Sequence, residues 1–241
     1  MIKAILFDLD NTLIDFMKMK QKSCEAAIDA MISAGLKAEK EKTLKVLFKL
    51  YDKYGIEHQH IFEKLLKKIT GKVDYRIIAH GIIAYRKLKE TQLILYPGAM
   101  QTLIELKKKH KLGIITDAPR MNAWNRLVAL RIDEFFDVVV TAADVRKQKT
   151  SLAPFRAALK KLKVKPEEAL MIGDRIKRDI KTAKNLGIKT CYARYGDLKP
   201  AERGESGADW EINDVRELVK LRLEGGERRG EVKWMVENRK T

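Results

Sequence analysis

Short apolar runs without polar alternation recur along this chain, separated by longer helical patterns. The runs occupy residues 2–7, 112–116, 138–141, 169–173, 189–193 and, more weakly, 209–213. Runs of this kind are typical of strands buried on both faces. Helical patterns fall between them at residues 98–110, 120–132, 151–163, 175–186 and 213–223. Strands alternating with helices of this length predict an α/β fold with a doubly wound parallel sheet.

Residues 16–94 interrupt this rhythm, because they contain no convincing strand pattern. Apolar residues recur there at spacings of three and four, which predicts amphipathic helices. We expect about four helices forming a bundle, with breaks near Gly35, Gly55 and Gly71. A helical domain inserted directly behind the first strand is well placed to act as a lid.

These patterns divide the chain into three parts. We expect a core formed by residues 1–15 and 95–223, a helical cap at 16–94, and a tail of uncertain structure at 224–241. Within the core, we expect Trp124 to pack in the interior.

The first apolar run ends in two carboxylates one residue apart, Asp8 and Asp10, with the hydroxyl of Thr12 two residues further on. Either Asp could simply cap the next helix or turn. However, two carboxylates at the mouth of a hydrophobic strand are costly to bury unless something binds there. The pair therefore indicates a reaction centre, with one carboxylate to attack, one to move a proton, and a metal ion to balance the charge.

Other reactive side chains follow the remaining strands. Thr116 closes the second run, Lys149 lies in the loop after the third, and Asp174 follows the fourth. In a doubly wound sheet, ligands bind beyond the carboxyl ends of the strands. We therefore expect these side chains to converge with Asp8 and Asp10 at one edge.

Four sequence elements resemble the motifs of the haloacid dehalogenase superfamily, in particular its phosphatases with a helical cap. In chain order they are Asp8-x-Asp10-x-Thr12, Thr116, Lys149 and Gly173-Asp174-x4-Asp179. The resemblance covers about residues 1–215. It implies a Rossmann-like core, a mobile cap and aspartyl-phosphate chemistry.

The resemblance also implies a role for each matching residue. Asp8 would be the nucleophile, and Asp10 would protonate the leaving oxygen and then deprotonate the hydrolytic water. Thr116 would donate a hydrogen bond to the phosphoryl group. Lys149 would neutralise charge on the phosphoryl oxygens and on Asp8.

A Mg²⁺ cofactor is implied in the same way, with Asp8, Asp10, Asp174 and Asp179 as the candidate metal residues. Asp174 would bind the ion together with Asp8 and the backbone carbonyl of Asp10, and Asp179 would support the ion's surroundings or Lys149. Mg²⁺ prefers one or two carboxylates with water and phosphate oxygens. We therefore expect a Mg²⁺-dependent phosphatase that hydrolyses a small phosphorylated metabolite.

Several alternatives stay open at this stage. Relatives that dehalogenate 2-haloacids lack the second Asp, so Asp10 favours phosphoryl transfer, with phosphomutase and phosphonatase chemistry as further alternatives. Thr150 follows Lys149 where the family usually has Pro, and Lys147 is near enough to serve instead. The spacing to Phe155 favours Lys149.

The chain carries a formal net charge of +17, which could attract nucleic acid or other anions. A basic binding or regulatory protein is therefore the non-enzyme alternative. The basic residues are spread along the chain and interleaved with acids, and no nucleic-acid-binding motif is visible, so we expect no nucleic-acid partner. The Lys- and Glu-rich usage is also typical of thermophile surfaces.

We expect a cytoplasmic protein without a membrane partner. No apolar run approaches the roughly 20 residues needed to span a bilayer, and no secretory pattern is visible. The two cysteines, Cys24 and Cys191, lie far apart in the sequence. Whether the protein is a monomer or a homodimer stays open. The substrate also stays open, although it would be selected by cap loops near residues 16–22, 52–60 and 70–76.

Overall fold

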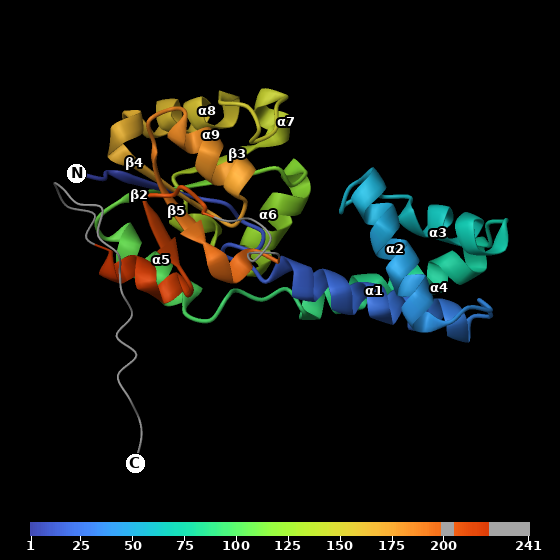
Figure 1. Ribbon diagram of the computed structural model, residues 1–241. Helices are drawn as coiled ribbons and strands as arrows, with labels where there is room; N and C mark the ends of the chain where they lie inside the picture. The colour runs from blue at the N-terminus through green and yellow to red at the C-terminus, as the bar shows by residue number, and fades with distance from the viewer. Residues whose placement is uncertain (199–204, 222–241) are drawn as a thin grey trace, which may run out of the picture.

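The computed structural model describes residues 1–198 and 205–221, and its centre is a parallel sheet of six strands in the order β3-β2-β1-β4-β5-β6 (Figure 1). The strands are β1 Ala4–Phe7, β2 Lys111–Thr116, β3 Val138–Thr141, β4 Ala169–Gly173, β5 Lys189–Ala193 and β6 Trp210–Ile212. The strand order reverses between β1 and β4, which pair in register from Ala4 with Ala169 to Phe7 with Ile172. The predicted Rossmann-like, doubly wound sheet is confirmed, and this reversal is the point where such sheets bind ligands.

Alternate residues of the central strands face two separate helical layers. Ile5 and Phe7 pack in a cluster with residues of α5 (Ala99–Lys107), α6 (Arg120–Ala129) and η6 (Val215–Lys220). Ala4 and Leu6 pack instead with residues of α8 (Ala153–Leu162) and α9 (Lys181–Lys184). Both faces are therefore buried, which explains why the strand sequences show no polar alternation.

Most core helices lie where the sequence predicts them. They are α5 Ala99–Lys107, α6 Arg120–Ala129, α7 Ala142–Val145, α8 Ala153–Leu162 and α9 Lys181–Lys184, with short 3-10 turns η1 Asp133–Phe135, η2 Pro166–Glu168, η4 Arg194–Gly196 and η6 Val215–Lys220. The helix expected at 175–186 begins as a π-helical turn, η3 Ile176–Ile180, and the helix expected at 213–223 is the 3-10 turn η6. The expected tail at 224–241 lies outside the described residues.

The insertion after β1 is helical throughout, as expected. Its helices are α1 Phe16–Ser33, α2 Lys40–Tyr54, α3 Ile61–Thr70 and α4 Tyr75–Thr91, and the chain turns between successive helices at Gly35, Gly55 and Gly71. The four helices enclose a hydrophobic cluster of their own, separate from the clusters of the core. In Figure 1 the insertion stands beside the sheet, joined to it by α1 and α4.

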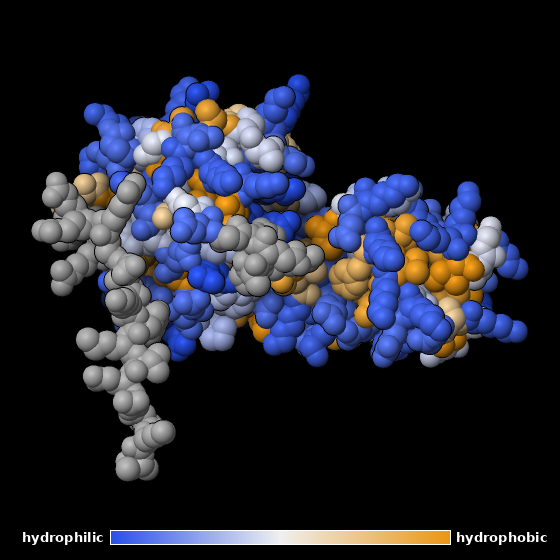
Figure 2. All heavy atoms as spheres, viewed as in Figure 1, coloured by the Kyte–Doolittle hydropathy of each residue, from blue (hydrophilic) through white to orange (hydrophobic). Residues whose placement is uncertain are grey.

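Side chains on the surface are mainly polar, with hydrophobic residues gathered over the inserted helices and where they meet the core (Figure 2). The expectation that Trp124 packs in the interior is wrong, because its side chain lies on the outer face of α6 and is 40% exposed. Within the described ranges, none of the helices combines the length and the apolarity that a membrane span requires.

Candidate active site

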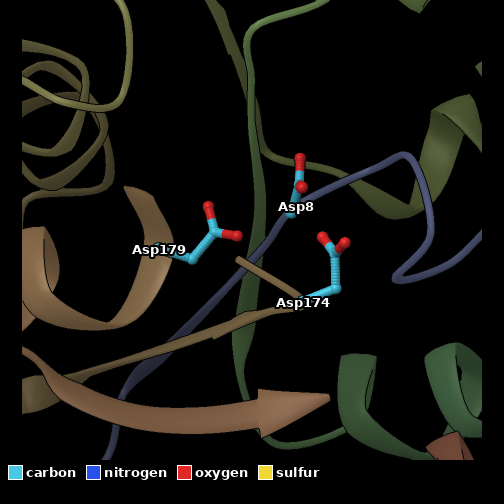
Figure 3. A group of neighbouring side chains, drawn as sticks. All are labelled: Asp8, Asp174 and Asp179. Atoms are coloured by element: carbon cyan, nitrogen blue, oxygen red, sulfur yellow. The ribbon is translucent and has the colours of Figure 1, made fainter. Parts of the chain in front are cut away.

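Three carboxylates gather at the carboxyl edge of the sheet, at the reversal of strand order. Asp8 follows β1 and donates its backbone N–H to Ile172 O of β4 at 2.8 Å, and Asp174 follows β4 itself. Asp179 comes from η3. One oxygen from each of these buried side chains lies within 4.8 Å of the others, and Figure 3 shows the three carboxylates converging from separate segments. Adjacent parallel strands therefore bring together residues that are more than 160 positions apart.

Lys149 places its ammonium group between two of these carboxylates. Its Nζ lies 2.7 Å from Asp8 Oδ1 and 2.6 Å from Asp179 Oδ1, whereas Lys147 is exposed. Burial by itself would lower the pKa of the Lys149 ammonium group. The negative charges of Asp179 and Asp8 outweigh this effect and raise the pKa. The backbone N–H of Lys149 donates to Asp117 Oδ1 at 2.9 Å, which ties the loop to the end of β2.

The π-helical turn η3 seats Asp179 against the end of β4. The backbone N–H of Arg175 donates to Asp179 Oδ2 at 3.0 Å, and a side chain at Gly173 would overlap the Asp179 carboxyl group. A glycine at position 173 is therefore required for this close approach. π-helical turns often occur at functional sites.

The donor set fits a small divalent cation. Asp174 Oδ1 is buried without a hydrogen-bond partner among the described residues. Burial, Asp8 and Asp179 raise the pKa of Asp174 well above its usual value, and burial also raises the pKa of Asp179 to about 6. Three buried carboxylates face one ammonium group, so a cation beside Asp8 and Asp174 would balance the remaining charge.

Asp10 is not part of this three-carboxylate cluster and contacts a different cation. Its Oδ2 accepts a hydrogen bond of 2.6 Å from Arg126 of α6, while its Oδ1 is buried without a partner in the described part of the chain. Burial raises the pKa of Asp10 to about 7, against the pull of Arg126. A carboxyl group with such a pKa can both give and take a proton near neutral pH.

The loop that carries Asp10 is held tightly from behind. Asn11 has a φ of 61°, a left-handed conformation that Asn adopts more readily than most residues. Tyr195 donates its hydroxyl to Thr12 O at 2.6 Å, and a side chain at Gly196 would overlap the Asn11 carbonyl oxygen. The segment after β5 therefore fixes the path of the chain between Asp8 and the insertion.

Thr116 closes β2 at the same edge and is buried. Its Oγ1 accepts a hydrogen bond of 3.1 Å from the backbone N–H of Ala118, which leaves the hydroxyl proton available as a donor. The hydrogen bond expected from Thr116 to a phosphoryl group stays a prediction.

A cavity of about 670 Å³ opens over these residues, between the core and the insertion. Its core side is formed by Asp8, Asp10, Asn11, Thr116, Asp117, Ala118, Pro119, Gln148, Lys149, Asp174, Arg175, Arg178 and Leu198. The inserted helices contribute Phe16, Met17, Phe48, Tyr51, Asp52, Tyr54, Gly55, Ile56, Glu57 and His58. Two of the three expected cap segments, near 16–22 and 52–60, reach the cavity. The expectation for 70–76 is wrong among the described residues, because this turn lies at the far end of α3.

Sequence reasoning missed the roles at the site of Arg126, Glu57 and Asp117. Glu57 accepts hydrogen bonds from Arg126 and Asn122, and Asp117 accepts one from Arg178 at 3.1 Å. One local signal existed for Arg126, since it shares the buried face of α6 with Ala123 and Leu127. A charged residue on such a face indicates a buried partner.

The family follows from comparison with known proteins. Residues 5–193 match the family described as Haloacid dehalogenase-like hydrolase. The chain belongs to this family. Among its relatives is a glyceraldehyde 3-phosphate phosphatase of Methanocaldococcus jannaschii, 39% identical, with 92% of this chain and 97% of the relative covered. A second phosphatase of the same name, from Pyrococcus furiosus, is 36% identical with 91% and 92% covered.

A solved structure in this family has the same fold. The crystal structure of a HAD phosphatase from Thermococcus onnurineus superimposes with a TM-score of 0.67 at 28% identity, covering 91% of this chain and 97% of that one. The prediction of a haloacid dehalogenase-type hydrolase with a Rossmann-like core is therefore confirmed. Relatives named as phosphatases support a phosphoric monoester hydrolase over the dehalogenase alternative.

Proposed function

We propose that this protein is a Mg²⁺-dependent phosphatase that hydrolyses a small phosphomonoester through an aspartyl-phosphate on Asp8. The observation that carries this proposal is the cluster of Asp8, Asp174 and Asp179 around Lys149 at the floor of the cavity. A carboxylate nucleophile beside a buried ammonium group can meet a phosphate that would otherwise be repelled.

The reaction runs in two steps on the residues of this chain. Asp8 attacks phosphorus, the bond from phosphorus to the leaving oxygen breaks, and Asp10 gives that oxygen its proton. Asp10 then takes a proton from a water molecule, which attacks the phosphorus of the aspartyl-phosphate. Inorganic phosphate leaves and the Asp8 carboxylate is restored, so both carboxyl groups return to their starting states.

Charge on the phosphoryl oxygens is met by groups already in place. Lys149 would contact these oxygens as well as Asp8, and Thr116 would donate its hydroxyl proton to them. Asp8, Asp174 and the backbone carbonyl of Asp10 would hold the Mg²⁺, with Asp179 supporting Lys149. When bound, the ion supplies the positive charge that lets an anionic nucleophile approach an anionic phosphate.

Glyceraldehyde 3-phosphate is the first substrate that we propose. The relatives at 39% and 36% identity are named for this activity, and they align over nearly their whole length with this chain. The cavity has room for a small metabolite beneath the inserted helices.

The proposal extends to the lid, the oligomeric state and the location of the protein. Residues 16–94 would act as the lid of a core formed by 1–15 and 95–223. The proposed site residues all come from one chain, so a monomer suffices for the chemistry. Both cysteines are free and buried, which agrees with a reducing, cytoplasmic location.

Phosphate release from glyceraldehyde 3-phosphate, measured with Mg²⁺ and then with EDTA, tests the function. We expect turnover with Mg²⁺, none with EDTA, and none in Asp8→Asn. The matched control is Asp29→Asn, which alters an exposed carboxylate on α1. Full activity in Asp8→Asn, with the fold unchanged, would refute the proposed nucleophile.

A further inference from the structure

One guanidinium group joins the loop of Asp10 to the inserted domain. Arg126 projects from α6 and its side chain is only 3% exposed. It donates to Asp10 Oδ2 at 2.6 Å through one terminal nitrogen and to Glu57 Oε1 through the other. Its central carbon lies 4.6 Å from the ring centroid of Phe16, the first residue of α1. The loop after β1, the start of the insertion and the turn after α2 therefore meet at one side chain.

Glu57 is held to α6 by two side chains. Its second carboxylate oxygen accepts a hydrogen bond from Asn122, one helical turn before Arg126. Since Glu57 lies between α2 and α3, these contacts fix the inserted domain on the core. A different position of that domain would remove Glu57 from Arg126.

The contact with Arg126 gives the two carboxylate oxygens of Asp10 different surroundings. Oδ2 accepts from the guanidinium group, while Oδ1 is buried with no partner in the described part of the chain, and Asp10 lines the cavity. The planar, two-pronged Arg side chain fixes direction as well as charge, which a lysine cannot do. Oδ1 is thereby left free of the guanidinium group and available to carry the transferred proton.

We propose that Arg126 positions Asp10 for proton transfer and that Glu57 completes this arrangement only when the inserted domain sits on the core. This inference rests on the proposed phosphatase function. It makes Arg126 a positioning residue, because Arg126 does not line the cavity and acts on the substrate through Asp10. Glu57 lines the cavity, and its proposed role is exerted on Asp10 through Arg126. The proton donor is therefore assembled by the same contact that closes the site.

The dependence of the rate on the leaving group separates positioning from a merely structural role. Release of an alkoxide from glyceraldehyde 3-phosphate needs a proton from Asp10, whereas 4-nitrophenolate leaves readily as an anion. The ratio kcat/KM reports the first chemical step, so later hydrolysis of the phosphoenzyme does not affect it.

The test compares Arg126→Met with the control Arg120→Met on both substrates. Arg120 lies on the same helix with an exposed side chain paired to Asp144. We expect Arg126→Met to lower kcat/KM for glyceraldehyde 3-phosphate by about 100-fold or more, the usual range for losing a general acid. We expect the loss with 4-nitrophenyl phosphate to stay below about 5-fold, and Arg120→Met to change neither value.

Arg126→Lys covers the case in which Arg126→Met does not fold, because it keeps the charge and loses the two-pronged geometry. Arg126→Lys should again lower kcat/KM more for glyceraldehyde 3-phosphate than for 4-nitrophenyl phosphate, with smaller losses than Arg126→Met. Equal losses on both substrates, or no loss, would overturn the inference while leaving the phosphatase function intact. Absence of turnover by the unmodified protein on both substrates would instead defeat the proposed function and this inference with it.

The role of Glu57 is tested by combining variants. Glu57→Gln alone should lower kcat/KM for glyceraldehyde 3-phosphate by about tenfold, as expected for weakening a hydrogen bond between charged groups. In the Arg126→Met background it should have little further effect, because the contact is already lost. Glu63→Gln, a half-buried carboxylate on α3 that pairs with His60, is the control. Additive losses would show that Glu57 acts independently of Arg126 and would overturn this part of the inference.

Discussion

At the scale of single residues, two buried cations balance the charge of the carboxylates at the site. Lys149 forms ion pairs with Asp8 and Asp179, and Arg126 forms ion pairs with Asp10 and Glu57. Each cation is buried between two acids, so its removal would leave both without compensation. Removing one partner of a buried ion pair lowers the free energy of unfolding by more than the intact pair contributes to it.

Replacement of Lys149 by Met should therefore reduce stability and activity together. We expect the free energy of unfolding to fall by about 3–5 kcal/mol, because Asp8 and Asp179 would face each other without a cation. We expect phosphate release to fall by at least about 100-fold. Urea unfolding and a phosphate-release assay measure the two effects.

Lys147→Met is the matched control, since Lys147 lies two residues away on the exposed side of the same loop. Its stability should change by less than about 0.5 kcal/mol. Loss of turnover in Lys147→Met, with Lys149→Met active, would reverse the assignment of the active-site lysine.

At the scale of elements, the inserted helices contain a buried charge of their own. Lys20 of α1 donates to the Tyr85 hydroxyl of α4 at 2.9 Å, and its ammonium group lies 4.1 Å from the centroid of the Tyr51 ring of α2. Burial lowers the pKa of Lys20 to about 8. Three helices therefore meet around a cation that, among the described residues, forms no ion pair with a carboxylate.

This lowered pKa predicts a rise of stability with pH. Below about pH 8 Lys20 is protonated in both the folded and the unfolded state, so the cost of burying its charge is fully present. Above that value the folded protein loses the proton while the unfolded chain keeps it until near pH 10.5. Stability should rise with a slope of up to about 1.4 kcal/mol per pH unit from this group.

Lys20→Met removes the titrating group and should abolish this rise between pH 8 and about pH 9.5. Unfolding in urea across this range measures the slope for both proteins. Lys22→Met is the control, because Lys22 is exposed on the same helix. The prediction fails if the slope difference is the same for Lys20→Met and Lys22→Met.

The sequence predicted the bounds of several strands correctly, but it predicted less well which side of a helix is buried. Residues 138–141, 169–173 and 189–193 were expected as strands and are strands with the same bounds. A strand that is buried on both faces is uniformly apolar, so its bounds can be predicted from the local sequence. Trp124 was misplaced because a large apolar residue on a helix does not reveal by itself which neighbour, if any, covers it.

At the scale of the whole molecule, ligand binding and global stability are coupled. Asp8 and Asp174 follow different strands, and a cation held by both would bind only the folded protein. Any ligand that binds only the folded state stabilises it. If the cluster holds Mg²⁺ as we propose, it ties the stability of the core to this ion.

We expect Mg²⁺ at about 100 times its dissociation constant to add about 2.7 kcal/mol of stability. For a protein of this size, that corresponds to a rise in Tm of roughly 5–10 °C. Thermal unfolding followed by circular dichroism, with and without Mg²⁺, measures the shift without depending on turnover.

Asp174→Asn should remove most of this shift, and Asp29→Asn should leave it unchanged. An equal rise of Tm in Asp174→Asn would place the ion elsewhere in the molecule. The loss of the shift in Asp174→Asn, together with its retention in Asp29→Asn, would support the proposed metal position.

The sequence by itself determined the sheet, the inserted helices and the residues at the strand ends, because all of these leave a local pattern. Apolar runs mark the strands, and Asp8, Asp174 and their partners sit directly behind them. Only the tertiary structure decided that Arg126 and Glu57 meet at Asp10, 116 positions from Arg126 along the chain. Such contacts depend on how the inserted helices are placed against the core, and no periodicity in either segment records that placement.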